Sequence, residues 1–541
     1  MKSLEESLEE SLQESGQPTQ FAEVAPAISP ISPISPISPI SPISPISPIS
    51  PASEKHSAPN AHDTHDTHDT HDTHDTHGTH GTHGAHATHD PYLALRSRDF
   101  RLLAIGRFVA TLGQQMLYVA IGYEIYLRTH SALALGYVGL AEFLPVVALL
   151  LPAGHIADHY DRRLISLASQ VTLLVAALGL AALSYTQGPL PLMYGCILLM
   201  GTATAFGDPA SSAFVSQVVP AEAFSNAAAW SSSSWQLASV VGPALGGVVI
   251  AVQGRASLVY VLDAIAALAF VGLLVVIRSH PTPRPHETMT AGSLVAGVGF
   301  IWRTKIILAA ITLDLFAVLL GGATTLLPIF ALSVLHVGAA GLGLLRAAPA
   351  VGAVVMALAQ AHLPPLRRAG RALLWAVAGF GVATVVFGVS RSFALSLAAL
   401  AALGALDNIS VIIRSTLMLT RTPDAMRGRA SAVNSMFVGA SNELGGFESG
   451  LVAALFGPVV SVVAGGLGVV AVVGLAALIW PEVRRLGRLD DLSAASAASA
   501  ATPTATECDD KHDDKHDDKR DDKRGGWRAR DRARMRARWR R

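Results

Sequence analysis

Twelve apolar runs, each about 20 residues or longer, constrain the fold of this chain more than any other feature. Inside a bilayer the backbone N–H and C=O groups must bond to one another, so runs of this length and composition fold as membrane-spanning helices. The runs are 101–127, 134–157, 164–184, 190–217, 224–252 and 257–278, followed by 305–333, 338–362, 370–390, 394–421, 428–456 and 459–481. The sequence therefore predicts an all-α membrane protein with twelve transmembrane helices.

The two ends of the chain differ sharply from its middle, although the whole is 51% hydrophobic. Residues 1–91 hold Ile-Ser-Pro and His-Asp-Thr repeats, and residues 484–541 form a charged tail. Neither tail offers an apolar face to bury, so we expect both to be disordered. Between them we expect an N-terminal six-helix bundle at 92–279, a cytoplasmic linker with an interfacial helix at 280–304, and a C-terminal six-helix bundle at 305–483.

The loops between the runs predict the orientation. Most of the arginines and lysines lie in loops on one side, whereas the loops on the other side hold only Arg128, Arg255 and Arg391. Basic loops stay on the cytoplasmic side of a membrane. The acidic, polar N-terminus has no apolar core of the kind a signal peptide needs. We expect a multi-pass protein of the bacterial inner membrane, with both termini in the cytoplasm.

A charged turn follows the second apolar run. Gly154, which allows close helix approach, comes before Asp158, Arg162 and Arg163. The two arginines hold this turn on the cytoplasmic side. In the fifth run, Gly242, Pro243, Gly246 and Gly247 form a Gly-Pro-x-x-Gly-Gly motif. Its proline removes a backbone hydrogen bond and its glycines remove bulk, so this helix can bend and pack closely.

Charged residues inside the apolar runs are the candidates for a transport site, because such residues usually face a bundle interior or a water-filled cavity. The substrate and proton candidates are Glu142, Asp314, Arg346, Asp407, Arg414 and Glu443. Asp407 and Arg414 lie two helical turns apart and so share a face. A carboxylate that exchanges protons suits a proton-coupled carrier, whereas a static buried ion pair would only hold helices together. Glu124, Asp208 and Asp263 lie nearer run ends, where capping or snorkelling is a sufficient explanation.

These features together resemble the major facilitator superfamily, including its signature loop G-x-x-x-D-x-x-x-R-R at 154–163. The segments 208–247 and 426–458 are similar to the branch that contains the enterobactin exporter and macrolide-efflux-type carriers. The resemblance implies two six-helix bundles that rock about a central site. It associates the fifth-run motif with exporters. It also implies that Asp158 stabilises the outward-open state by facing the start of the eleventh helix, near Arg429–Ser431.

We therefore expect a secondary active transporter, a proton-coupled exporter of a siderophore or an amphipathic drug. The expected partners are that small organic substrate, protons and the bilayer, with no nucleic acid, cofactor or metal, and the expected state is a monomer. One alternative is a non-transporting sensor whose histidine-rich tail responds to metals; deletion of residues 1–90 would abolish a sensor's response but not transport. A second is an importer or lipid carrier on the same scaffold. We expect no enzyme, because no nucleophile–base pair or phosphate loop occurs in the cytoplasmic loops.

Overall fold

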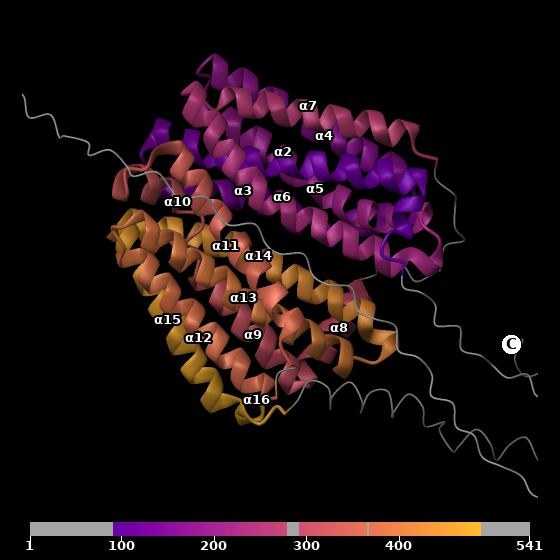
Figure 1. Ribbon diagram of the computed structural model, residues 1–541, viewed down its shortest axis with the longest axis vertical. Helices are drawn as coiled ribbons and strands as arrows, with labels where there is room; N and C mark the ends of the chain where they lie inside the picture. The colour runs from indigo at the N-terminus through magenta and orange to yellow at the C-terminus, as the bar shows by residue number, and fades with distance from the viewer. Residues whose placement is uncertain (1–89, 279–290, 365–366, 488–541) are drawn as a thin grey trace, which may run out of the picture. The chain divides into compact units, whose positions relative to one another are not determined.

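The computed structural model of the protein describes residues 90–278, 291–364 and 367–487 (Figure 1). The two predicted disordered tails lie almost entirely outside these residues. Within them every regular element is a helix, and no β-strand occurs. The six helices of the first half are α2 (Arg98–Thr129), α3 (Ala132–His159), α4 (Arg162–Tyr185), α5 (Leu190–Val218), α6 (Phe224–Gln253) and α7 (Ser257–Val276).

The second half begins with the short helix α8 (Ala291–Arg303), where the sequence predicts an interfacial helix. It continues through α9 (Lys305–Leu320), α10 (Leu327–Ile329), the π-helical segment Phe330–Val334, α11 (Gly338–His362), α12 (Ala369–Val389), α13 (Phe393–Arg421), α14 (Asp424–Phe456), α15 (Pro458–Ile479) and α16 (Pro481–Arg484). The observed helices match the predicted runs closely. Apart from the run 305–333, the largest shift is at α14, which begins at Asp424 rather than at 428 because Pro423 precedes its first turn.

Ten of the described helices are long and apolar enough to cross a membrane. Two predicted runs correspond to helices outside that set. The run 305–333 is not one continuous helix, since α9 ends at Leu320 and a turn separates it from α10. The break lies at Gly321, where an added Cβ would be 2.5 Å from the carbonyl oxygen of Ala317 and 2.6 Å from Cε1 of Phe380, so a larger residue would force these neighbours to shift. The second helix outside that set is α14, a 33-residue helix that carries Glu443 and Glu448 in its C-terminal part.

Short turns join the helices, and capping groups at the helix ends define where each helix begins or stops. The hydroxyl of Ser131 accepts a hydrogen bond from the backbone N–H of Ala134 at 3.4 Å, and Asp161 accepts one from that of Arg163 at 2.9 Å. Such caps satisfy donors that the first helical turn leaves free. At the other ends of their helices, Gly254 and Gly457 have positive φ values of 69° and 90°, which a glycine adopts at little cost.

Helices of each half pack mainly on one another, and two main pairs connect the halves. In the first half α2 packs on α6 and α7, while α4 packs on α5 and α7; in the second half α12 packs on α13 and α15. The two main pairs that connect the halves are α3 with α14 and α6 with α11, and α2 makes smaller contacts with α10 and α11. Figure 1 shows α3 and α6 running beside α14 and α11. Any site between the halves must therefore lie among these four helices and α2.

Two arginines identify the two ends of the helix array. The side chain of Arg163 donates to the carbonyl oxygens of Leu274 and Val275, at 2.9 and 2.5 Å, so the start of α4 and the end of α7 lie together. At the opposite end Arg128 donates to the carbonyl of Gly188 at 2.9 Å. We call these the Arg163 end, which is the predicted cytoplasmic end, and the Arg128 end.

Candidate functional site

Two cavities lie between the halves and meet near the middle of the helices. The main cavity, of about 840 Å³, is lined by helices of the first half and by α14, and it extends toward the Arg163 end, where Gly154 borders it. The smaller cavity, of about 340 Å³, is lined by α2, α3, α11 and α14 and reaches the turn at Thr324 and Thr325. The side chains common to both linings are Gln115, Tyr118, Glu142 and Glu443, together with Gly439.

A cluster of four side chains occupies the place where the cavities meet. The hydroxyl of Tyr118 donates a 2.7 Å hydrogen bond to Oε1 of Glu142. The guanidinium carbon of Arg346 lies 5.9 Å from the centre of the Tyr118 ring, within the range of a cation–π contact. Arg346 also borders the smaller cavity together with Glu142 and Glu443, close enough for its charge to act on both carboxylates, although it forms no ion pair with either among the described residues. We call Tyr118, Glu142, Arg346 and Glu443 the junction cluster.

The helices that hold this cluster approach closely because small residues surround it. A Cβ added to Gly139 of α3 would lie 2.9 Å from Oε2 of Glu443, so the carboxylate rests against the backbone of α3. A Cβ on Gly201 of α5 would collide with the carbonyl oxygen of Glu142. Glycine at these two positions lets α14 and α5 press against α3 on either side of the Glu142 turn. The cluster therefore joins a carboxylate of the first half to an arginine and a carboxylate of the second.

The lining of the main cavity is rich in carboxylates. Glu142, Asp208, Asp263 and Glu443 border it, with Arg107 as the basic side chain among its described lining residues. The charge of Arg107 acts on Asp208. Such groups persist inside a membrane protein when they face a solvated cavity rather than lipid.

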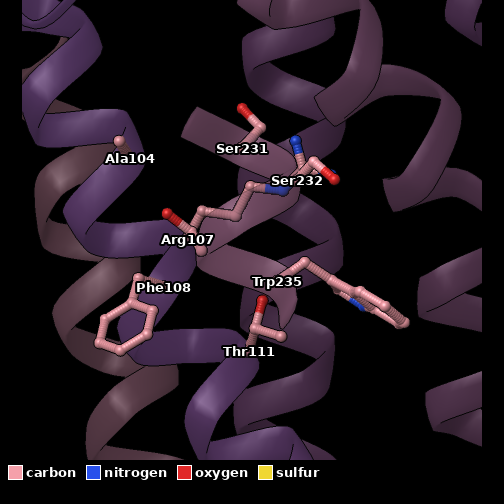
Figure 2. A pocket seen from close by; sticks show the side chains of 8 residues that line it. Ala104, Arg107, Phe108, Thr111, Ser231, Ser232 and Trp235 are labelled. Atoms are coloured by element: carbon pink, nitrogen blue, oxygen red, sulfur yellow. The ribbon is translucent and has the colours of Figure 1, made fainter. Parts of the chain in front are cut away.

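Arg107 also borders a side pocket of about 330 Å³ between α2 and α6. Figure 2 shows its side chain extending from α2 toward Ser231 and Ser232 of α6, with Trp235 in the neighbouring turn. Thr111 and Trp235 border both this pocket and the main cavity. The side pocket is therefore an extension of the main cavity that offers a cation, hydroxyl groups and an aromatic ring.

Glycine contacts close the Arg128 end between the halves. A Cβ on Gly247 of α6 would lie 2.6 Å from the carbonyl oxygen of Ala339 and 2.8 Å from Cα of Gly343, both on α11. A Cβ on Gly450 of α14 would lie 2.8 Å from Cα of Gly136 on α3. The backbones of both connecting helix pairs thus touch there, whereas the main cavity separates α14 from the first half toward the Arg163 end.

The predicted fifth-helix motif lies at these contacts. Gly247 packs on α11, whereas Gly242 and Gly246 pack on α2: their added Cβ atoms would lie 2.6 Å from Cβ of Gln115 and 3.0 Å from Cα of Met116. Pro243 is inside α6, and its carbonyl oxygen lies against Gly343. The motif therefore brings α6 close to two partners at once, one in each half.

The predicted charged turn contributes helix-end contacts. Arg162 donates to the carbonyl oxygen of Ala213 at 3.3 Å, near the end of α5, while Arg163 caps the end of α7 as described above. Gly154 borders the main cavity. Asp158 belongs to the last turn of α3, but its side chain lies outside what the structure describes. Its predicted position against the start of α14 stays a prediction.

The remaining predicted residues lie away from the junction cluster. Arg414 of α13 forms a buried ion pair with Asp314 of α9, and the exposed fractions of the two side chains are 7% and 5%. Although Asp407 shares a helix with Arg414, its carboxylate forms no ion pair with any described residue. The structure thus brings together Glu142, Arg346 and Glu443, and separately Asp314 and Arg414, but leaves Asp407 apart from both groups.

Several residues that line the cavities were not predicted from the sequence, most of them because they carry no charge. Tyr118, Gln114 and Gln115 lie on α2, and the amide of Gln114 donates to the Tyr118 hydroxyl at 3.1 Å. Three neighbouring polar side chains within an apolar run could have indicated a helix face that lines a cavity. Asp263 was assigned to a run end, yet it borders the main cavity, and its Oδ1 would be 2.7 Å from a Cβ on Gly113. Position along a single helix does not show which neighbour it faces.

Comparison with known proteins places these features in a family. Residues 89–510 match the family model described as transmembrane secretion effector. The enterobactin exporter EntS of Citrobacter koseri is 30% identical over 390 residues, which cover 71% of this chain and 92% of the relative. The enterobactin exporter EntS of Escherichia coli strain SMS-3-5 is 28% identical over 401 residues, covering 73% and 95%.

Solved structures share the fold at low sequence identity. A bacterial homologue of the human lysosomal transporter Spinster, in an inward-facing and occupied conformation, superposes with a TM-score of 0.58 at 13% identity, covering 73% of this chain and 99% of that one. The nucleoside transporter NupG superposes with a TM-score of 0.53 at 14% identity, covering 75% and 100%.

Proposed function

We propose, from the premise that this chain belongs to the transmembrane secretion effector family of major facilitator transporters, that it is a proton-coupled exporter of a small organic molecule. The family is one of membrane transporters rather than a class of enzymes. The observation that carries the proposal is the junction cluster, where Glu142 of the first half meets Arg346 and Glu443 of the second between two cavities.

The proposed architecture follows from the packing. The helices α2–α7 would form the first six-helix bundle, at 92–279, and α9–α15 the second, at 305–483, with α9 and α14 completing the twelve spans. The interfacial helix α8 belongs to the linker between them. With the Arg163 end in the cytoplasm, the main cavity opens inward and the glycine contacts at the Arg128 end close the outward path. We propose a monomer in the bacterial inner membrane with both termini in the cytoplasm.

The cluster provides a means of coupling protons to the movement of the halves. While both carboxylates are charged, Arg346 is attracted to Glu142 across the interface and to Glu443 on its own side. A proton on one carboxylate removes the attraction between that carboxylate and Arg346, so the other carboxylate alone then attracts the arginine. Because Glu142 and Arg346 belong to different halves, this change alters the balance between the inward-open and outward-open arrangements.

The proposed substrate is a siderophore, because the relatives that cover most of the chain are named enterobactin exporters. A specific observation also favours an amphipathic cation of the drug type. Four carboxylates border the main cavity against Arg107, an excess of negative charge that attracts cations. The two substrates differ in charge, so one transport panel separates them.

The test uses everted membrane vesicles that hold a preformed pH gradient, with siderophores, macrolides and cationic dyes added in turn. The proposal predicts that one of these compounds collapses the gradient only in vesicles containing the protein. Vesicles containing an Arg346→Gln variant at equal abundance are the matched control. A flat response to every compound, with the protein confirmed in the membrane, would contradict the proposal.

The sensor alternative has its own test. The histidine repeat lies outside the described residues, but Asp90 is described and forms an ion pair with Arg96 at 2.5 Å. Deletion of residues 1–89 spares this pair. Transport that persists in the truncated protein would support a carrier, whereas loss of a metal response without any measurable transport would support the sensor.

A further inference from the structure

A groove of about 640 Å³ lies between α12 and α15 at the Arg163 end. Arg371, Trp375 and Ala378 of α12 form one wall, at spacings that place them on one helix face. Val473 and Ala477 of α15 form the other wall. No residue of this groove borders the central cavities, so it is separate from the proposed transport site.

The short helix α16 adds two more arginines to the groove. Its Val483 is only 1% exposed, and its carbonyl lies so close to Gly370 that an added Cβ there would collide with it. The backbone N–H of Ala369 donates to the carbonyl of Gly487 at 3.1 Å. These contacts fix α16 against the start of α12, which brings Arg484 and Arg485 to the same groove as Arg371.

The groove is strongly basic. Its described lining holds three arginines and no acidic side chain. None of these arginines takes part in an ion pair with a described residue. Glu482 is an exposed neighbour in α16 but does not line the groove. Three guanidinium groups converge here, a donor arrangement that suits phosphate oxygens.

The rest of the groove is apolar and opens onto the outer surface of the helices. The Trp375 side chain is 73% exposed. Farther along the same two helices, Val382 of α12 is 54% exposed and Val470 of α15 is 36% exposed, as expected of residues that face acyl chains. Figure 1 shows α12 and α15 side by side, with α16 at the end of the pair. A tryptophan between arginines and an apolar face is typical of the membrane interface.

We propose that this groove binds an anionic phospholipid of the leaflet at the Arg163 end. The three arginines hold its phosphate and anionic headgroup, Trp375 lies at the level of the glycerol backbone, and an acyl chain follows the apolar wall between α12 and α15. A basic recess between spanning helices on the cytoplasmic side has the charge and position for such a lipid. A zwitterionic lipid has the same acyl chain, but the three arginines attract its headgroup less strongly.

The experiment measures fluorescence quenching in reconstituted full-length protein by brominated phosphatidylglycerol and by brominated phosphatidylcholine. The signal of Trp375 is obtained as the difference between the wild type and the Trp375→Phe variant. We expect half-maximal quenching of Trp375 at about a tenfold lower fraction of the anionic lipid, as a net attraction from several arginines implies.

Two triple variants test the role of the arginines. Replacement of Arg371, Arg484 and Arg485 by glutamine should abolish the preference for the anionic lipid. The matched control replaces Arg101, Arg278 and Arg421, which are also exposed, and should retain the preference. If the first variant fails to insert into the membrane, the comparison of the two lipids on the wild type and Trp375→Phe still shows whether the groove prefers the anionic lipid.

Two results would overturn the proposal. Equal quenching by both lipids would show that Trp375 only contacts bulk lipid. Loss of the anionic preference on adding millimolar glycerol phosphate would assign the arginines to a soluble phosphate compound instead of a lipid.

Discussion

The hydroxyl of Tyr118 donates to Oε1 of Glu142 at 2.7 Å while the guanidinium of Arg346 covers the ring of the same tyrosine. One side chain of α2 therefore contacts both a carboxylate of the first half and a cation of the second. Movement of one half relative to the other changes the contact with Arg346, whereas the bond to Glu142 stays within the first half. This makes Tyr118 a direct structural connection between the proton-binding candidates and the rearrangement of the halves.

The Tyr118→Phe substitution tests that connection. The ring and its contact with Arg346 remain, but Glu142 loses its donor, at a cost of about 1 kcal/mol. We expect a melting temperature lower by a few degrees at most and a clear loss of proton-driven transport, measured in vesicles. Tyr185→Phe is the control, because Tyr185 is 74% exposed. Equal transport by both variants would remove Tyr118 from the mechanism.

Gly247→Ala tests the closed contact at the Arg128 end. Its methyl group would meet backbone atoms of Ala339 and Gly343 on α11, which cannot rotate away, so α6 and α11 must separate. Overpacking of this kind costs about 1–3 kcal/mol. We expect lower thermal stability and greater access of a water-soluble thiol reagent to a cysteine placed near Ala339.

Gly272→Ala supplies the matched control for Gly247→Ala. Gly272 is also helical, and nothing lies within 4 Å of the position where its Cβ would be. This variant should retain the wild-type melting temperature and reagent access. Equal behaviour of the two variants would show that the α6–α11 contact does not close the path.

The sequence predicted the helices well and their side-chain partners poorly. Helix positions follow from a local requirement, because in a bilayer an apolar run must bond its own backbone. Ser131 and Pro423 then define where α3 and α14 begin, and Gly457 defines where α14 ends. The break at Gly321 was missed because apolar residues continue on both sides of it. Hydropathy records composition, whereas the break depends on packing against Phe380, which lies in a different helix.

The contacts between site residues of different helices were even harder to predict from the sequence. Asp407 and Arg414 share a helix face, but this spacing did not reveal that Arg414 pairs with Asp314 of α9. Such pairing depends on how neighbouring helices are rotated, which one helix's periodicity does not determine. Glu142 and Glu443 were recognised as embedded charges because charge itself is visible in a sequence. Their position beside Arg346 required the structure.

The buried pair of Asp314 and Arg414 is expected to stabilise the fold. Asp314→Asn should leave an uncompensated guanidinium inside the second half, at a cost of about 3–5 kcal/mol. The double variant Asp314→Leu with Arg414→Met should recover most of that loss, because both charges are then absent. Thermal unfolding in detergent measures both. A stable Asp314→Asn protein with altered proton coupling would instead assign the pair to transport.

Arg163 is expected to act through the end of α7. Arg163→Gln removes the donors that its guanidinium gives to the carbonyls of Leu274 and Val275, and a lost donor to a partly buried carbonyl costs about 1–3 kcal/mol. We expect a lower melting temperature than that of Arg101→Gln, since Arg101 is exposed. Identical melting curves for the two variants would contradict this account of the charged turn.

The most direct test of the central claim is substrate accumulation driven by an imposed pH gradient in proteoliposomes. We expect the Glu443→Gln variant to exchange substrate across the membrane but no longer to accumulate it against its concentration gradient. Glu448→Gln, five residues farther along α14 and outside both cavity linings, should accumulate substrate like the wild type. Gradient-driven accumulation by the Glu443→Gln and Glu142→Gln variants at the wild-type level would contradict the claim that the junction cluster couples protons to export.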